Sequence, residues 1–435
     1  MNKFVQHVAL QFIPKRNNNS CLLFFKDYLF KTIFLLSCLL AAVSVQAVTN
    51  PLYIDLMFSS GKQKTIFHNL SKQFANEHPD ITVITRLHEQ EKYKEKVISL
   101  LMSGSSDVLF GFVGAQFTSL VALGEIAAID DLWQQQQWDN DFSQAVKSAV
   151  MVDMKHYALP LSYYQWGFYY RKSIFNKYNL LPPTTWQEFL QVGRVLKANG
   201  ITPIVLGSKD LWTVAGWFDY LNLRINGLQF HRRLLLGKVP YNDERVKRVF
   251  SYWQELLQLG FFADRHDQYD WRQSLPYLYR GKGGMLLMGN FVVPQLPEKI
   301  IEDIGFFRFP KINEKIPFYE EAPLDVLAIP QRAKNKAAAK KFLAFMARKD
   351  IQEKMNQQMG MISANKHAAQ GEDVFIQAGA DILAQADGIS QFYDRDTPPE
   401  MFVPGMSAMS EFMKNPDDID NILDRLETER QRVFK

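Results

Sequence analysis

Residues 52–58 read Leu-Tyr-Ile-Asp-Leu-Met-Phe, a largely apolar stretch that is typical of a buried β-strand. The turn-forming residues Ser59-Ser60-Gly61 interrupt it. In the segment that follows, the apolar residues recur at helical spacing: Ile66, Phe67, Leu70 and Phe74. We therefore expect a strand that is followed directly by a helix.

The same alternation continues toward the C-terminus. His78-Pro79-Asp80 ends the helix, and Ile81 and Val83 begin a second strand. A second helix is expected over residues 93–102, and the short apolar segment 107–110 predicts a third strand. This order of elements is typical of an α/β fold with a mostly parallel sheet wrapped by helices.

The N-terminal segment has the features of a secretory signal peptide. Residues 1–31 carry five basic residues and a single acid, and an apolar run from Ile33 to Val43 follows them. Val45-Gln46-Ala47 then provides a cleavage site with Ala at its last position. The run is shorter than the roughly 20 residues that span a bilayer. We predict cleavage after Ala47 (signal peptide, residues 1–47), export to the periplasm, and an uncleaved anchor as the alternative.

A lipid anchor at Cys38 is the other alternative for this segment. Leu35-Leu36-Ser37-Cys38 loosely resembles a lipobox. The apolar run continues past Cys38, however, which argues against lipidation.

Removal of residues 1–47 changes the composition of the chain. Both cysteines lie in that segment, so the mature chain has no disulfide, thiol nucleophile or zinc–thiolate site. Five Lys or Arg and one Asp are also removed, which leaves 45 basic and 45 acidic residues and no net charge. Nothing in this balance points to nucleic acid. The remaining 388 residues are enough for two lobes with separate cores.

Five groups of segments, in order along nearly all of the mature chain, resemble the family 1 extracellular solute-binding proteins, which include maltose- and glycerol-phosphate-binding proteins. The segments are Phe74-x4-Pro79-x-Ile81-x-Val83; Tyr93-Lys94-x-Lys96 with Ser103-Gly104-x-x-Asp107-Val108; Tyr157-Ala158-Leu159-Pro160 with Tyr169-Tyr170-Arg171-Lys172-Ser173-Ile174-Phe175 and Leu181-Pro182-Pro183-Thr184-Thr185-Trp186-Gln187-Glu188-Phe189; Tyr279-Arg280-Gly281-Lys282-Gly283-Gly284-Met285 with Gly289-Asn290-Phe291; and Ala339-x-x-Phe342-Leu343-x-Phe345-Met346 leading to Gly360-Met361.

The resemblance implies a periplasmic-binding-protein-like fold of two lobes, each with a mostly parallel sheet, joined by three crossings. We expect lobe one at 48–161 plus 318–363 and lobe two at 162–317 plus 364–435. The implied function is the capture of a carbohydrate (a sugar, oligosaccharide or polyol) for an ABC permease in the inner membrane. No cofactor, metal or catalytic residue is implied, and we expect a monomer.

Two of these segments also have a physical interpretation that is purely structural. Thr185-x-x-Glu188 is a capping box at the start of a helix, so Trp186 is expected in the core of lobe two rather than at a ligand. Gly281-Lys282-Gly283-Gly284 does not have the spacing of a phosphate-binding loop. We predict a helix end that turns into a strand at residues 285–288.

Candidate ligand-binding residues follow from where strands end. In open parallel sheets, ligands bind beyond the carboxyl ends of strands, in the crevice between lobes. This places Phe58 and Ser59 near the ligand, whereas the loop 111–116 offers no anchor at its tip apart from Phe112. The ligand would therefore be held mainly by lobe two.

The resemblance adds candidates in three segments, at Tyr164 and Trp166, at Trp217, and at Asn290 and Phe291. Trp271 is added because it stands at a predicted helix start that faces the crevice, and Asp325 and Met361 because they lie close to predicted crossings. The family places ligand contacts in the segment that holds Tyr164 and Trp166, and Phe291 stands where the family has a tryptophan that stacks on a sugar ring. Core or hinge packing is the competing interpretation for the aromatic residues, and a capping or interlobe ion-pair role for Asp325. The candidates are Phe58, Ser59, Tyr164, Trp166, Trp217, Trp271, Asn290, Phe291, Asp325 and Met361.

Two other functions remain as alternatives. The same binding protein could signal to a membrane sensor kinase or chemoreceptor. A glycoside hydrolase would need a pair of carboxylates. Glu320 and Glu321 are adjacent, and neighbours in an extended segment point to opposite faces, so they cannot flank one bond. We interpret them as a solvated acidic turn.

Overall fold

The computed structural model describes residues 51–435. The predicted signal peptide, its cleavage site and the Cys38 alternative lie outside the described residues. Within residues 51–435, none of the helices is long and apolar enough to cross a membrane.

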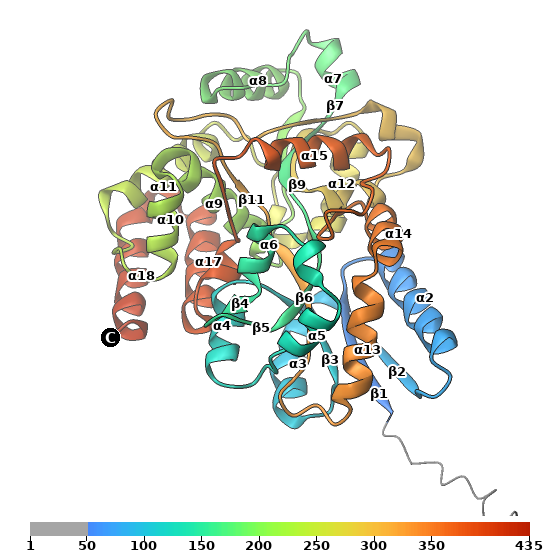
Figure 1. Cartoon of the computed structure of the whole chain (residues 1–435). Helices are drawn as coiled ribbons and strands as arrows, with labels where there is room; N and C mark the ends of the chain where they lie inside the picture. The colour runs from blue at the N-terminus through green and yellow to red at the C-terminus, as the bar shows by residue number, and fades with distance from the viewer. Residues whose placement is uncertain (1–50) are drawn as a thin grey trace, which may run out of the picture. The chain divides into compact units, whose positions relative to one another are not determined.

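The first sheet has six strands in the order β13-β6-β12-β3-β1-β2. Its strands β1, β2, β3 and β6 are labelled in Figure 1. Strand β1 pairs in parallel with β2 and β3, and the other three pairings are antiparallel. The strands are β1 Leu52–Phe58, β2 Val83–Glu89, β3 Val108–Phe112, β6 Ala158–Tyr163, β12 Leu324–Ala328 and β13 Ile362–Ser363.

The first three strands alternate with helices as the sequence predicts. Helix α2 (Gly61–Glu77) follows β1 at once, and its hydroxyl cap is Ser60, which accepts from the Gln63 N–H. Its predicted apolar face is buried, and it packs against β1 and β2. Helix α3 (Gln90–Ser103) ends at Gly104, whose φ of 61° lies in the left-handed region that glycine tolerates.

The second sheet has four strands in the order β10-β7-β9-β8, and only β8 and β9 run in parallel. The strands are β7 Trp166–Arg171, β8 Thr202–Val205, β9 Gly283–Gly289 and β10 Ile304–Phe307. The α/β class with helix-flanked sheets is confirmed, but the expectation of mostly parallel sheets is wrong. Strand β7 runs opposite to the other three strands, and its partners β9 and β10 follow more than 100 residues later, so a local pattern does not reveal this direction.

Helices cover the second sheet, and the predicted capping box is present. The Thr185 hydroxyl accepts from the Glu188 N–H, and the Glu188 carboxylate accepts from the Thr185 N–H. Trp186 is buried and donates to Glu255 at 3.0 Å. The helices of residues 172–279 are α7 Lys172–Lys177, α8 Trp186–Ala198, α9 Trp212–Asn226, α10 Leu228–Leu235, α11 Glu244–Gln258 and α12 Trp271–Tyr279.

The remaining elements complete the chain. The helices are α4 Ala115–Ala122, α5 Asp130–Gln135, α6 Gln144–Ala149, α13 Lys336–Ala347, α14 Lys349–Met359, α15 Val374–Ala384, α16 Tyr393–Asp396, α17 Pro399–Lys414 and α18 Ile419–Val433. Short strands are β4 Met151–Val152, β5 Lys155–His156, β11 Tyr319–Glu321 and β14 Gly388–Ser390, and 3-10 turns are Trp138–Asn140, His266–Gln268, Asn290–Gln295, Glu298–Asp303 and Pro416–Asp418.

The chain passes directly from one sheet to the other between β6 and β7. Strand β6 ends at Tyr163 in the six-stranded sheet, and β7 begins at Trp166 in the four-stranded sheet. The chain passes back between β10 and β12. The lobe boundaries, 48–161 with 318–363 and 162–317 with 364–435, stay a prediction.

The interpretation of Glu320 and Glu321 as a solvated turn is wrong. Both residues lie in β11, which pairs in parallel with β14, and both side chains are fully buried. Their opposite orientation is confirmed by their different partners. Glu320 accepts from Arg224 at 2.7 Å, whereas Glu321 lies 3.9 Å from His231.

Candidate functional site: a pocket between the two sheets

A pocket lies where elements of both sheets meet, and it encloses about 850 Å³ of space that is partly open to solvent. The six-stranded sheet contributes the residues after β1, the end of β3 and the start of β12. The other side comes from the start of β7, the start of α9 and the turn after β9. The pocket therefore occupies the crevice beyond strand ends where the sequence predicts a ligand.

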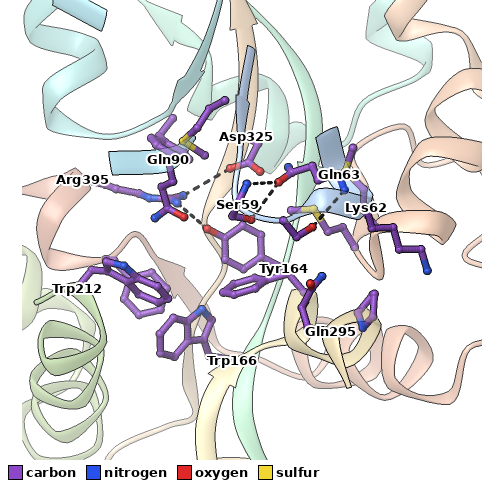
Figure 2. A pocket seen from close by; sticks show the side chains of 18 of the residues that line it. Ser59, Lys62, Gln63, Gln90, Tyr164, Trp166, Trp212, Gln295, Asp325 and Arg395 are labelled. Carbon is purple, nitrogen blue, oxygen red and sulfur yellow. Dashed lines mark hydrogen bonds and ion pairs between the residues drawn. The ribbon is translucent and has the colours of Figure 1, made fainter. Parts of the chain in front are cut away.

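Aromatic side chains form one wall of the pocket (Figure 2). The rings of Tyr164 and Phe291 meet edge to face with centroids 5.1 Å apart. The ring centroid of Trp166 lies 5.8 Å from that of Trp212 and 4.6 Å from that of Phe392. Rings that contact one another in this way hold each other in place, so the wall offers a rigid apolar surface to a ligand.

The polar part of the pocket centres on Arg395, Asp325 and Tyr164. Figure 2 shows the three side chains converging from different elements. Arg395, on the short helix α16, donates from Nη2 to the Tyr164 hydroxyl at 2.5 Å. Its guanidinium also stacks on Phe112, 3.9 Å from the ring centroid. The nearest atoms of Arg395 and Asp325, Nη1 and Oδ1, are 3.9 Å apart.

Burial changes the acidity of this group. The loss of hydration raises the pKa of Asp325 from its ordinary value of 3.8 to about 7, and the nearby Arg395 charge offsets only part of the rise. Burial likewise raises the pKa of Tyr164. The Tyr164 hydroxyl is therefore neutral at physiological pH, while Asp325 titrates close to neutrality.

Ser59, directly after β1, also lines the pocket and is held by its neighbours. Its N–H and its hydroxyl both donate to the Gln63 amide oxygen, at 2.7 and 3.0 Å. Its carbonyl oxygen accepts from Arg272 of α12, which also donates to Glu89 at 3.3 Å. Ser59 thus marks a direct contact between the first strand's carboxyl end and the helix that covers the second sheet.

The structure brings six of the ten predicted residues to this pocket. They are Ser59, Tyr164, Trp166, Phe291, Asp325 and Met361. Their role as ligand contacts stays a prediction.

The structure does not place the other four, Phe58, Trp217, Trp271 and Asn290, at the pocket. Trp217 is fully buried in the core, with its ring 5.7 Å from Phe168 and 5.2 Å from Phe262. Trp271 is buried behind the aromatic wall, 5.5 Å from Phe291. For these two tryptophans, packing explains their position without a ligand.

Phe58 and Asn290 also lie outside the lining. Phe58 faces the ammonium group of Lys64, which lies 5.4 Å from its ring centroid. Asn290 is buried at the start of the turn after β9, and its N–H donates to the Gln165 carbonyl at 3.1 Å. That bond ties the end of β9 to the passage between the sheets.

Sequence reasoning missed several lining residues. Trp212 starts α9, five residues before Trp217, and Arg395 and Phe392 lie beyond the last family segment. On the side of the six-stranded sheet, the polar groups come from the first turns of helices α2 and α3 rather than from loop tips: Lys62, Gln63, Gln90 and Lys94. A signal was present at Arg395, because an arginine between two aspartates directly follows Phe392 and Tyr393.

The pocket combines an aromatic wall with buried polar groups. Within residues 51–435, no group of three or more His, Cys, Asp or Glu side chains is arranged to hold a metal ion. Two helix-flanked sheets, with a pocket of aromatic rings and buried polar groups between them, define a ligand-capturing protein of the two-lobed type.

The comparisons with known proteins identify the family. The model of the bacterial extracellular solute-binding proteins matches residues 59–353. The chain belongs to this family, as the ordered segments in the sequence suggest. It is therefore a solute-binding protein of the kind that serves ABC transporters.

Three relatives show the range of the similarity. An ABC transporter extracellular-binding protein of Pyrococcus horikoshii is 24% identical over 72% of this chain and 71% of its own length. The multiple sugar-binding protein of Streptococcus mutans is 25% identical over 45% of this chain and 48% of its own. The solved bacterial solute receptor AcbH superimposes with a TM-score of 0.84 and 26% identity, over 88% of this chain and 99% of that one.

Proposed function

We propose that this protein captures a carbohydrate in the periplasm and delivers it to an ABC permease in the inner membrane. The observation that carries the proposal is the composition of the pocket. An aromatic wall suits the C–H faces of a sugar ring, and a buried carboxylate and guanidinium suit its hydroxyl groups.

The relatives support the carbohydrate assignment. The Streptococcus mutans protein is named for its binding of multiple sugars. The AcbH receptor is described as having an exclusive preference for β-D-galactopyranose. A compact hexose is therefore the first ligand to test.

The proposed mechanism is closure of two lobes around the solute. A ligand that contacts both sides of the pocket stabilises the closed arrangement over the open one, so binding shifts the equilibrium between them. Arg272 already joins the two sides through the Ser59 carbonyl and Glu89. The closed form is the one that the permease would recognise, and the protein itself performs no turnover.

A thermal-shift screen tests the proposal directly. Purified mature protein is heated with monosaccharides, oligosaccharides, polyols and glycerol phosphate. A ligand that binds only the folded protein at 100 times its Kd adds about 2.7 kcal/mol to the free energy of unfolding. We expect Tm to rise with at least one carbohydrate. A rise with another solute class, and with none of the carbohydrates, would refute the assignment.

A further inference from the structure

Two charged atoms of the pocket lack a hydrogen-bond partner. Asp325 Oδ1 and Arg395 Nη1 are both buried, and neither has a partner within residues 51–435. They are 3.9 Å apart, which is beyond the 2.7–3.2 Å of a hydrogen bond. Leaving a buried charged atom unpaired is costly, so such a gap calls for a group that pairs with both atoms.

The surrounding structure holds the guanidinium in place. Arg395 is fixed by the Tyr164 hydroxyl on one side and by the Phe112 ring beneath it. Its helix, α16, is fixed as well. The Tyr393 N–H donates to Asp219 at 2.9 Å, and the Asp394 carbonyl accepts from Gln116 at 2.6 Å.

The carboxylate is fixed by its strand. Asp325 lies near the start of β12, where its backbone is opposite Phe112 of β3 on one side and Ser162 of β6 on the other. The register with β6 shifts directly after it, between Asp325 and Val326. A strand that is paired on both edges cannot move toward α16 to close the gap.

We propose that one hydroxyl group of the ligand bridges Asp325 Oδ1 and Arg395 Nη1, and that this pair selects a neutral, hydroxyl-bearing ligand. The inference rests on the proposed function and narrows its substrate class. An oxygen about 2.8 Å from each atom spans the gap. A hydroxyl is both a donor and an acceptor, so it donates to the carboxylate and accepts from the guanidinium.

Charged groups do not meet both requirements. A ligand carboxylate would pair with Arg395, but it would lie against Asp325, which is itself ionised above pH 7. A ligand ammonium would pair with Asp325, but it would repel Arg395 and could not accept from it. Above pH 7, a uronic acid or an amino sugar at this position would therefore bind less tightly than the parent sugar.

The test measures binding by titration calorimetry with D-galactose, its monodeoxy analogues, D-galacturonate, D-galactosamine, D-xylose and maltose. Asp325→Asn and Arg395→Gln are compared with the wild type. The matched control is Asp131→Asn, which removes an exposed carboxylate from the surface. Circular dichroism and Tm establish that each variant is folded, and the nearly isosteric Asp325→Asn keeps the test valid if Arg395→Gln does not fold.

We expect a neutral sugar to bind the wild type, and each variant to bind it about 10- to 100-fold more weakly, as for the loss of a hydrogen bond to a charged group. One deoxy analogue should bind the wild type more weakly than the parent sugar does, by a similar factor. In Asp325→Asn the difference in affinity between the two sugars should be much smaller, because the bridging hydroxyl has already lost its partner there.

Other results would overturn the inference in distinguishable ways. Tight binding of a neutral sugar with unchanged affinity in both variants would refute the bridge and leave carbohydrate capture standing. Tighter binding of galacturonate or galactosamine than of galactose would refute the selection for neutral ligands. If none of the carbohydrates binds, the proposed function fails, and this inference fails with it.

Discussion

Two buried arginine–carboxylate pairs among the described residues are built differently. In the first, Arg224 donates to Glu320 at 2.7 Å, to the Phe309 carbonyl at 3.2 Å and to the Tyr319 carbonyl. In the second, Arg395 bonds to Tyr164 but stands 3.9 Å from Asp325, and both facing atoms lack a hydrogen-bond partner among the described residues.

The partners around the two carboxylates differ in the same way. Arg308 lies 3.2 Å from Glu320, and the Tyr220 hydroxyl donates to Glu320 at 3.3 Å. Within residues 51–435, the distant Arg395 is the only ion-pair partner of Asp325. We call Arg224 and Glu320 the closed pair, because their charges are satisfied within the protein. This pair joins α9 to β11, next to the passage between the sheets. We call Arg395 and Asp325 the open pair, because their facing atoms are free to bind another molecule. A binding site needs such free groups, whereas a protein core does not.

Arg224→Met should have the largest effect on stability. The change removes the main partner of Glu320 and leaves the buried carboxylate with Arg308 and the Tyr220 hydroxyl. Breaking a buried ion pair in this way costs about 3–5 kcal/mol. Chemical denaturation of the unliganded protein measures this free energy of unfolding.

Arg395→Met is the matched control for that measurement, because its pair is already open. We expect a clearly smaller loss of stability and a loss of sugar affinity. Equal destabilisation by the two substitutions would contradict the distinction between a structural pair and a binding pair.

The pH dependence of stability should report the open pair. Because the pKa of Asp325 is about 7 in the folded protein and 3.8 in the free side chain, the fold favours the protonated form. The stability that protonated Asp325 contributes to the folded protein is therefore lost as pH rises from about 4 to about 7, and the free energy of unfolding does not change further above that pH on its account. The full effect is up to about 4 kcal/mol at 1.36 kcal/mol per pKa unit.

Thermal unfolding of the unliganded wild type and Asp325→Asn from pH 4 to pH 8 measures this contribution. As pH rises from 4 to 7, the unfolding free energy of the wild type should fall relative to that of Asp325→Asn. The informative quantity is the change of this difference with pH rather than its size at one pH, because removing the carboxylate also alters the surroundings of Arg395 at every pH. Asp131→Asn should show the opposite sign and a small size, because the Lys340 ammonium lowers the pKa of the exposed Asp131. A pH-independent difference for Asp325→Asn would contradict the expectation.

Glu321→Gln extends the comparison to a buried carboxylate with no arginine bonded to it. Its two oxygens lack hydrogen-bond partners among the described residues, and burial together with Asp219 raises its pKa well above 4.5. The neutral amide avoids the cost of the buried charge. At pH 8 we expect the variant to be more stable by about 1–3 kcal/mol, with the difference shrinking toward pH 4.

The same thermal unfolding series measures this difference. Glu320→Gln is the control, because its carboxylate is bonded to Arg224 and its replacement should destabilise the protein. A Glu321→Gln variant less stable than the wild type at pH 8 would show that the charge is compensated.

The sequence predicted the local parts of the fold better than the distant pairings. The β1-α2-β2-α3-β3 segment follows from periodicity and turn residues that lie within about 60 residues. The antiparallel pairing of β7 with β9 and β10 joins residues more than 100 positions apart, and no local signal records its direction. The burial of Glu320 and Glu321 has the same origin, since Arg224, which bonds to Glu320, lies 96 residues earlier in the chain, and His231, near Glu321, is similarly distant.

The site was predicted where strand ends determine it. Tyr164 and Trp166 were named because their segment follows a strand end and the family places ligand contacts there, and Phe291 was named from the resemblance; all three line the pocket. Trp217 was chosen over Trp212, yet five residues turn a helix by about 140° at 3.6 residues per turn, so the two tryptophans face different surroundings. Arg395 was missed because a four-residue helix late in the chain supplies it.

The smallest effects should come from removing one hydroxyl at each arginine pair. Tyr164→Phe takes from Arg395 the oxygen that holds its guanidinium at 2.5 Å. We expect sugar affinity to fall about 3- to 10-fold, because Arg395 keeps its own contact with the ligand but becomes less well positioned. Its effect on the free energy of unfolding should be minor, since Phe112 still supports the guanidinium. Calorimetric titration and chemical denaturation measure the two quantities.

Tyr220→Phe is the counterpart at the closed pair. The Tyr220 hydroxyl lies 3.0 Å from the Trp166 carbonyl and 3.3 Å from Glu320 Oε2, and both contacts are buried. We expect a loss of about 1 kcal/mol in unfolding free energy and no change in sugar affinity. The two variants remove the same atom from the same residue type, so the direction of the effects is the informative result. If Tyr220→Phe lowered sugar affinity while Tyr164→Phe lowered only the free energy of unfolding, the roles of the two pairs would be reversed.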